Sequence, residues 1–167
     1  MIEMEIGGLG FDPRNMSPIV LLRDKEERNF LPIWIGMFEA AAIAMELQKF
    51  ETPRPMTHDL LKTVIEKLGG HVEKVIINDI QNNTFFCVIE LKIKNAKGEQ
   101  QVQGIDARPS DGIALAVRTQ APIFVSEVVM MQAKMVNVEK DAEETQKFKE
   151  FIKNVNPEDF TQYFQKH

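Results

Sequence analysis

The chain has 167 residues and a formal net charge of −5, from 20 basic and 25 acidic side chains, and 44% of its residues are apolar. This length fits one domain with a short appendage, and the apolar share is sufficient for a buried core. The acidic balance excludes a protein that coats nucleic acid through bulk positive charge, but it is compatible with an enzyme whose carboxylates hold metal ions. The single cysteine, Cys87, excludes an intrachain disulfide and a cysteine-based zinc site.

The N-terminal stretch and the longest apolar run indicate the cellular compartment of the protein. The N-terminal stretch MIEMEIGGLGFD contains acidic side chains and no basic leader, so we expect no signal peptide. The longest apolar run, near 35–45, is interrupted by Glu39 and is too short to span a membrane. Together with the single cysteine, these features predict a cytoplasmic protein without a membrane partner.

The first part of the chain predicts three strands followed by a helix. The strands are expected at 2–11, 19–22 and 30–35, and a polar turn joins the last two. Trp34 lies in an apolar strand, so we expect it in the core. The segment 36–50, GMFEAAAIAMELQKF, is rich in alanine and apolar nearly all round, which predicts a buried helix.

A second helix is expected after the proline-containing loop 51–56. Thr57 is a good N-cap, Asp59 suits the helix dipole, and Gly69–Gly70 ends the helix. Its apolar stripe consists of Leu60, Leu61, Val64, Ile65 and Leu68.

Three further strands are predicted at 72–80, 84–94 and 101–107, with polar turns between them. Pro109 and Ser110 then open a third helix over 111–119, which is apolar on most faces, and a short strand follows at 121–126. The order of elements predicts an α+β fold.

A shift of 72 residues aligns the two parts of the chain. It places 33–35 on 105–107, Glu39 on Asp111, and the alanine-rich segment 42–45 on 114–117. We interpret this as duplicated strand-strand-strand-helix units with mainly antiparallel sheets and buried small-residue helices. The alternative is a chance alignment of two alanine-rich helices.

The composition changes near residue 132. We therefore predict a domain over 1–132 and a charged, amphipathic helical tail over 133–167. Asp141–Lys153 carries Phe148, Phe151 and Ile152 on one face, so we expect this extension to be a docking arm rather than a partly mobile extension.

The segment Pro53–Asp59 is the first candidate for chemistry. Its prolines fix a loop that enters a helix N-terminus, where free amide groups bind anions. Arg54 could hold a phosphate, His58 could shuttle a proton, and Asp59 could orient the histidine or bind a metal. The alternative is structural, since capping, the helix dipole and ion pairing explain the same residues.

The segment Ile105–Asp111 is the second candidate. Asp106 lies in an otherwise apolar strand and therefore needs a partner or an ion, for which Arg108 is the obvious choice. Ser110 and Asp111 both have ordinary roles at a helix start, so a structural ion-pair network explains the set as well as catalysis does. Glu39, among apolar neighbours, is harder to explain without a function.

These acidic residues suggest a divalent-metal site. Glu39, Asp106 and Asp111 could hold Mg²⁺ or Mn²⁺, and two such ions could activate a water for attack on a phosphodiester. His58 would act as a base and Arg54 or Arg108 would contact the phosphate. The sequence contains no metal motif of defined spacing, no dinucleotide fingerprint and no phosphate loop.

Three segments resemble the bifunctional nuclease family: LPIWIGMFEAAAIA (31–44), PRPMTHDLL (53–61) and IDARPSDGIALAVRTQAPIFV (105–125). The resemblance covers about 1–132 and implies an α+β domain, found in bacteria and plants, that cleaves both RNA and DNA. Gly112 stands where family members often have alanine, a change that we expect to be minor. By position in these motifs, the candidate catalytic residues are Glu39, His58, Asp59, Asp106 and Asp111, and the candidate substrate-binding residues are Arg54, Thr57, Arg108 and Ser110.

The sequence therefore leads to two main hypotheses. The first is a metal-assisted nuclease with nucleic acid as its substrate. The second is a non-catalytic dimeric scaffold or regulatory domain with a structural Asp-Arg-Ser network, and a weaker third is a domain that binds a small anion. In each case exposed sheet edges favour a homo-dimer or higher oligomer.

Overall fold

The computed structural model describes residues 1–138, with side chains described through residue 133. Within this part the fold is α+β, and seven strands form one sheet in the order β3-β2-β1-β7-β4-β5-β6. The predictions for the 139–167 region, including the amphipathic helix, lie outside the described residues, and the division at residue 132 stays a prediction. The strands are β1 (Ile2–Phe11), β2 (Pro18–Asp24), β3 (Phe30–Trp34), β4 (His71–Gln81), β5 (Thr84–Lys94), β6 (Gln100–Ala107) and β7 (Ile123–Val125).

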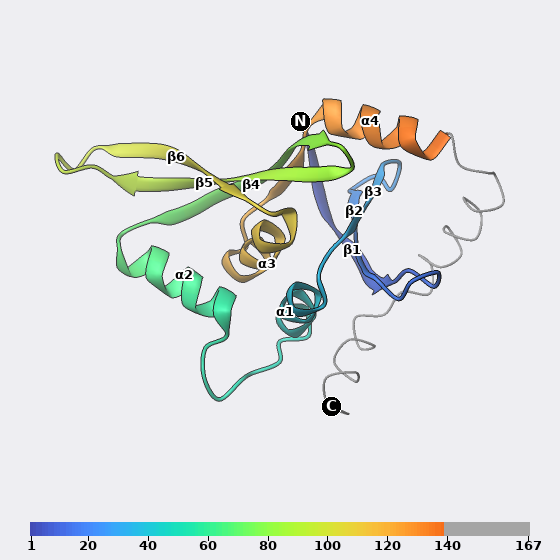
Figure 1. The fold of residues 1–167 in the computed structure, drawn as a ribbon. Coiled ribbons are helices and arrows are strands. Elements are labelled where there is room, and N and C mark those ends of the chain that lie inside the picture. Colours follow the sequence, from blue (N-terminus) through green and yellow to red (C-terminus); the bar gives the residue numbers. More distant parts are fainter. Residues whose placement is uncertain (139–167) are drawn as a thin grey trace.

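Two antiparallel meanders make up the sheet, and β7 joins them (Figure 1). The strand β7 pairs antiparallel with β1 and parallel with β4. Each meander is followed by a helix rich in small residues, α1 (Met37–Leu47) after β3 and α3 (Pro109–Thr119) after β6. This arrangement agrees with the predicted order of elements, while an evolutionary duplication remains a prediction.

The helices α1, α3 and α2 (Thr57–Lys67) lie on one side of the sheet, and α4 (Glu127–Val138) lies on the other (Figure 1). None of the sequence patterns predicted α4, whose Val129 and Met130 are buried in the core. Within the described residues no helix is long and apolar enough to cross a membrane.

Helices α1 and α3 meet through small side chains. Ala40, Ala44, Ala114 and Ala116 are buried at 1% exposure or less, which allows the two helix backbones to approach closely. The expectation that α1 is buried all round was wrong, because Phe38 at one side of the helix is 82% exposed. The burial of α3 is confirmed for most of its length.

Gly112 lies at a close contact between α3 and the sheet. A Cβ atom at this position would lie 2.7 Å from Cys87 Sγ and 2.9 Å from Val75 Cγ1, distances that real Cβ atoms do not show. An alanine at this position therefore requires the Cys87 or Val75 side chain, or α3 itself, to shift.

Trp34 and the apolar stripe of α2 also differ from the sequence-based expectation. Trp34 is 40% exposed and donates its indole hydrogen to Asp12 over 3.1 Å. In α2 only His58 is buried, whereas Leu60, Leu61, Val64 and Leu68 are exposed. Helical periodicity identifies an apolar face but does not determine whether that face meets its own core.

Candidate active site

The first turns of three helices meet at one cluster of polar side chains. Glu39 belongs to the first turn of α1, His58 to that of α2, and Asp111 to that of α3, with Arg108 as the N-cap of α3. Helix N-termini favour negative charge, because their first amide groups have no partner within the helix. Because the N-termini of three helices converge here, the carboxylates of Glu39 and Asp111 can lie close together.

Arg108 connects the two carboxylates. Its Nη2 donates to Glu39 Oε1 over 2.8 Å and its Nε donates to Asp111 Oδ2 over 2.8 Å. Hydrogen bonds to Asp111 and then to Glu39 raise the pKa of Arg108 above its ordinary value, so the guanidinium stays charged. The side chain of Arg108 is nevertheless 65% exposed, which leaves it open to solution.

His58 completes the cluster from the other side of Asp111. Its Nε2 lies 2.9 Å from Asp111 Oδ1, and the histidine is only 8% exposed. Burial acts to raise the pKa of Asp111, but the hydrogen bonds from Arg108 and His58 outweigh it and the pKa is lowered. Asp111 is therefore an ionised acceptor that can orient the imidazole ring.

The position of Glu39 depends on the glycine before α1. The side chain folds back over the N-cap residue, Gly36, where a Cβ atom would overlap Glu39 Oε2. The Glu39 side chain is 16% exposed in this position. Gly36 thus leaves the space that the carboxylate needs to reach Arg108.

Asp59 is adjacent to the cluster in sequence but serves a different contact. Its Oδ2 accepts the Met56 amide over 2.9 Å, and its Oδ1 accepts Arg118 Nε over 2.7 Å. Burial opposes ionisation of Asp59, yet the Met56 amide and Arg118 together lower its pKa. Asp59 therefore positions the start of α2 instead of contacting His58.

Arg118 is a buried residue that the sequence reasoning missed. Its guanidinium also donates to the carbonyls of Ala114 and Ala42, each over 2.9 Å, so it joins all three helices. Helical spacing could have identified it as a candidate. Arg118 lies seven residues after Asp111 and therefore on the same face of α3.

The structure brings four of the predicted site residues together: Glu39, His58, Arg108 and Asp111. Arg54 lies in the exposed loop before α2, and Thr57 is an exposed first residue of that helix. Neither takes part in the hydrogen bonds of the cluster.

The capping roles predicted for Thr57 and Ser110 were wrong. The N-caps are Met56 and Arg108. At the start of α2 the Asp59 side chain accepts the Met56 amide, and at the start of α3 the N-cap side chain makes no cap hydrogen bond. Ser110 is instead buried at 5% exposure.

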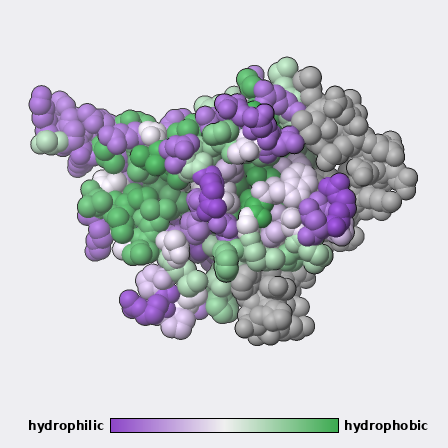
Figure 2. Space-filling model, in the orientation of Figure 1, coloured by the Kyte–Doolittle hydropathy of each residue, from purple (hydrophilic) through white to green (hydrophobic). Residues whose placement is uncertain are grey.

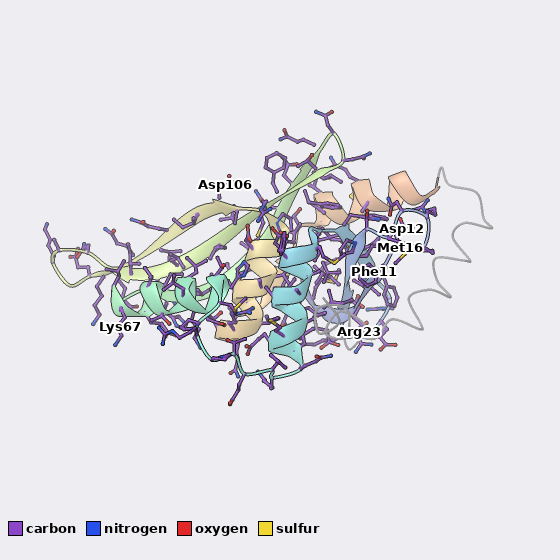
Figure 3. All side chains as sticks on the ribbon, turned by 60° about the horizontal axis from the view of Figure 1, so that its bottom comes forward. Phe11, Asp12, Met16, Arg23, Lys67 and Asp106 are labelled. Atoms are coloured by element: carbon purple, nitrogen blue, oxygen red, sulfur yellow. The ribbon has the colours of Figure 1, made fainter. Side chains whose placement is uncertain are left out.

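Asp106 lies on β6, an edge strand of the sheet, and is exposed (Figure 3). The expectation that it is buried among apolar residues was therefore wrong. Water can solvate its carboxylate, so it needs neither Arg108 nor an ion as a partner.

The predicted metal ligands do not fit a metal ion in this arrangement. Glu39 and Asp111 both direct an oxygen at Arg108, and Asp106 takes no part in their hydrogen bonds. Among the described residues no group of three His, Cys, Asp or Glu side chains is placed to hold a metal ion. The guanidinium of Arg108 occupies the place of a cation between the two carboxylates.

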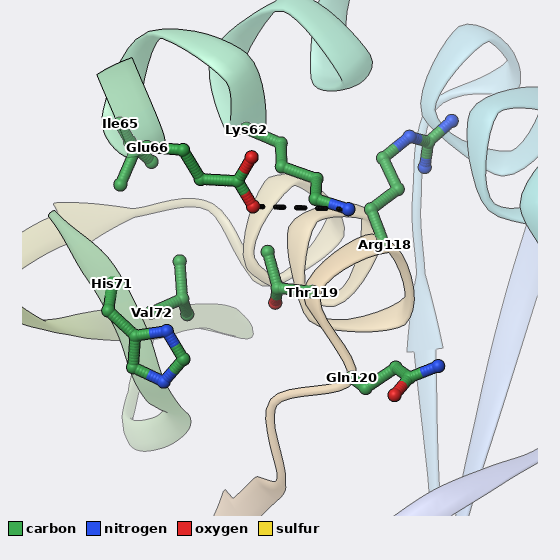
Figure 4. Close-up of a pocket in the computed structure, with 8 residues that line it drawn as sticks. All are labelled: Lys62, Ile65, Glu66, His71, Val72, Arg118, Thr119 and Gln120. Carbon is green, nitrogen blue, oxygen red and sulfur yellow. Dashed lines mark ion pairs between the residues drawn. The ribbon is translucent and has the colours of Figure 1, made fainter. Parts of the chain in front are cut away.

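A separate cavity of about 300 Å³ lies at the C-terminal end of α3 (Figure 4). Arg118 of α3 and Gln120, which follows this helix, line one side of it. The other lining residues include His71 of β4 and the ion pair of Lys62 and Glu66 on α2. The cavity contains none of the four cluster residues, so the polar cluster and the cavity are distinct features.

Comparison with known proteins connects the chain to one family. The model of the bifunctional nuclease domain matches residues 20–138. An uncharacterized protein of Mycobacterium tuberculosis is 39% identical over 171 residues, which cover 96% of this chain and 98% of that protein. Bifunctional nuclease 1 of rice is 28% identical over 65% of this chain and 32% of its own length. Bifunctional nuclease 2 of Arabidopsis thaliana is 26% identical over 66% of this chain and 33% of its own length.

Proposed function

Because the chain belongs to the bifunctional nuclease domain family, we propose that it hydrolyses the phosphodiester bonds of RNA and DNA. The observation that carries this proposal is the 2.9 Å hydrogen bond between His58 Nε2 and Asp111 Oδ1. A histidine oriented by an ionised carboxylate is a common general base. A cytoplasmic location is part of the proposal, and recovery of the chain from the membrane or secreted fraction would contradict it.

The nucleophile follows from the two substrates. DNA lacks the 2′-hydroxyl that could attack within RNA, so an enzyme that cleaves both cannot depend on that group, and we propose water as the nucleophile. With Asp111 accepting the hydrogen on Nε2, the Nδ1 atom of His58 takes a proton from the water as its oxygen attacks phosphorus. The bond from phosphorus to the leaving oxygen then breaks, and the imidazolium returns the proton to that oxygen.

Arg108 is the candidate contact for the phosphate. Its Nε and Nη2 donate to the two carboxylates, whereas Nη1 takes part in neither bond. A guanidinium presents several donors in one plane and can therefore hold a carboxylate and a phosphate together. Glu39 and Asp111 would fix its orientation before the substrate arrives, which reduces the cost of ordering it on binding.

The decisive experiment is cleavage of labelled single-stranded RNA and DNA by the purified full chain. We expect His58→Ala to lower the rate by at least about 100-fold, because general acid–base catalysis contributes 100-fold or more. Asp111→Asn and Arg108→Gln should lower it as well. The matched control is His71→Ala, since His71 is exposed on β4 and outside the cluster.

The same assay tests the predicted Mg²⁺ or Mn²⁺ requirement. Because Arg108 lies between Glu39 and Asp111, we expect cleavage to persist in EDTA. A loss of activity in EDTA that Mn²⁺ restores would mean that a metal displaces Arg108 from these carboxylates. Activity that is unchanged in both His58→Ala and Asp111→Asn would contradict the proposed site.

A non-catalytic dimeric scaffold is the second candidate function. Arg108 and Arg118 already neutralise Glu39, Asp111 and Asp59, as a structural network would require. In this case the folded wild-type chain cleaves neither substrate with or without metal, and cluster substitutions lower only its melting temperature. Cleavage by wild type that His58→Ala abolishes would exclude the scaffold as the sole function.

A further inference from the structure

Phe38 is an exposed aromatic side chain beside the polar cluster. It is the second residue of α1 and is 82% exposed, whereas Ala40, Ile43 and Ala44 of the same helix are buried in the core. An aromatic ring buries at least about 150 Å² when a partner covers it, and it contributes little to the fold while it lies in water. Within the described part of the chain no element covers Phe38, so its ring is open to a ligand.

The contacts of Glu39 place Phe38 at the cluster. The Cα atoms of these two residues are about 3.8 Å apart across one peptide bond, and Glu39 Oε1 accepts Arg108 Nη2 over 2.8 Å. Successive helical side chains point about 100° apart, so Glu39 faces α3 while Phe38 faces solution. The Arg108 side chain is 65% exposed, so the ring and the guanidinium are open on the same part of the surface. In Figure 2, hydrophilic side chains over α3 adjoin hydrophobic side chains over α1.

An aromatic ring beside a guanidinium matches the two parts of a nucleotide. The guanidinium donates to phosphate oxygens, and the ring stacks on a nucleobase, as in proteins that hold single strands. A phosphate on Arg108 links two nucleosides, and the base of one of them can therefore lie over the first turn of α1. An apolar protein surface fits less well, because covering Phe38 would also take the charges of Glu39 and Arg108 out of water.

Stacking also suits a site that accepts both RNA and DNA. Every nucleobase has a π face, and stacking contacts neither the 2′-hydroxyl nor the edges by which the bases differ. In a duplex the bases already stack on one another, so the ring can reach only an unpaired base. Given the proposed nuclease function, on which this assignment rests, we propose that Phe38 stacks on an unpaired base next to the phosphate held by Arg108. The substrate is then a single strand.

Binding of a labelled single-stranded oligonucleotide by the full chain tests the stacking contact. The His58→Ala background prevents cleavage during the measurement. In this background we expect Phe38→Ala to raise the Kd about 5- to 100-fold, for RNA and DNA alike. Phe38→Leu should also weaken binding, because leucine keeps an apolar side chain but loses the π face. Phe38→Trp should bind at least as tightly as the parent.

Phe30→Leu is the matched control. Phe30 is 42% exposed and begins β3, at the end of the strand away from α1. Its substitution should leave the Kd unchanged. Because Phe38 is itself exposed, its variants should all keep the wild-type melting temperature, which shows that a change in Kd is not a change in folding.

A fluorescent base reports the contact itself. A 2-aminopurine in the single strand loses fluorescence when it stacks, so binding should quench it, and Phe38→Leu should abolish this quenching. A blunt duplex of the same sequence has no base open to the ring, so Phe38→Ala should leave the Kd of the duplex unchanged. In the cleavage assay Phe38→Ala should raise KM and leave kcat nearly unaltered, as expected for a group that binds substrate and transition state equally.

Three results would overturn the stacking contact: a wild-type Kd for Phe38→Leu, equal effects of Phe38→Ala on single strands and duplexes, or a change in the mass of Phe38→Ala in solution, which would assign the ring to a protein contact. The two proposals can fail separately. Cleavage by a wild-type chain whose Kd does not depend on Phe38 contradicts only the stacking contact. A chain that binds single strands through Phe38 but cleaves neither substrate contradicts only the nuclease.

Discussion

Asp12, directly after β1, shows how one buried carboxylate can be satisfied locally. It is 3% exposed, and its two oxygens accept the backbone amide and the Nε of Arg14 over 3.0 Å, and Nη2 of the same arginine over 2.9 Å. Trp34 adds an indole donor over 3.1 Å. This bond gives Trp34 a polar partner near the surface and explains why an aromatic residue in an apolar strand is not fully buried.

The Asp12 network predicts acid sensitivity. The Arg14 side-chain hydrogen bonds outweigh burial and lower the Asp12 pKa to about 2. A carboxyl group whose pKa falls on folding stabilises the fold above its unfolded pKa, and this stability is lost as pH falls through the folded value. We therefore expect Asp12→Asn to lower the free energy of unfolding at pH 7 by about 1–2 kcal/mol, and the difference from wild type to shrink between pH 4 and 2.

Urea denaturation across this pH range measures the effect. Asp106→Asn is the control, because Asp106 is exposed and its substitution should leave stability at pH 7 unchanged. An Asp12→Asn variant whose deficit stays constant down to pH 2 would show that the hydrogen bonds, and not the charge, stabilise this turn.

At the scale of elements, one arginine holds α1, α2 and α3 together. The Arg118 side chain is 4% exposed and bonds to Asp59 of α2, Ala42 of α1 and Ala114 of its own helix. In α2, Ile65 packs against the core while Leu60, Leu61 and Val64 are exposed, so the polar bonds of Arg118 are a large part of what holds this helix. The orientation of His58 toward Asp111 therefore depends on Arg118 through the position of α2.

We expect Arg118→Met to lower the free energy of unfolding by about 2–4 kcal/mol, because it leaves Asp59 and two carbonyls without their donor. The effect should fall below that of a fully buried pair, since the Asp59 side chain is 35% exposed. Thermal and urea denaturation measure the change, with Lys62→Met on α2 as a control that keeps the Arg118 contacts. A change below about 1 kcal/mol would mean that water replaces the guanidinium.

At the scale of the molecule, a three-residue strand unites the two meanders. Ile123 and Val125 of β7 are 5% and 0% exposed, and β7 pairs with β1 on one side and β4 on the other. The helices add a second connection, because α1 follows the first meander and α3 follows the second. The described part of the chain therefore has one continuous core.

This architecture predicts that damage to β7 weakens both meanders equally. Val125→Ala should lower the free energy of unfolding by about 2 kcal/mol through lost burial and a residual cavity. Hydrogen exchange should then speed up to the same extent in β2 and β5, with a single unfolding transition. Two separate transitions, or faster exchange in only one meander, would contradict a shared core.

Local chemistry by itself determined most of the elements. Strands at 2–11 and 84–94 appear where alternation and turn residues predicted them, and α3 is buried as its small residues indicated. The segments that resemble the family also contain all four residues of the polar cluster. These features depend on neighbours a few positions apart, whose periodicity and backbone preferences are visible in the chain.

Only the tertiary structure decided which charges meet and which surfaces stay open. The bonds from His58 to Asp111 and from Arg108 to Glu39 join residues 53 and 69 positions apart, so no spacing rule predicts them. The same packing places Asp106 on an exposed edge strand and pairs Asp59 with Arg118. It also turned the α2 apolar stripe outward, because His58 and Asp59 hold the opposite side of the helix. A sequence pattern specifies the chemistry of each helix face, but the partner of that face is set by contacts between distant segments.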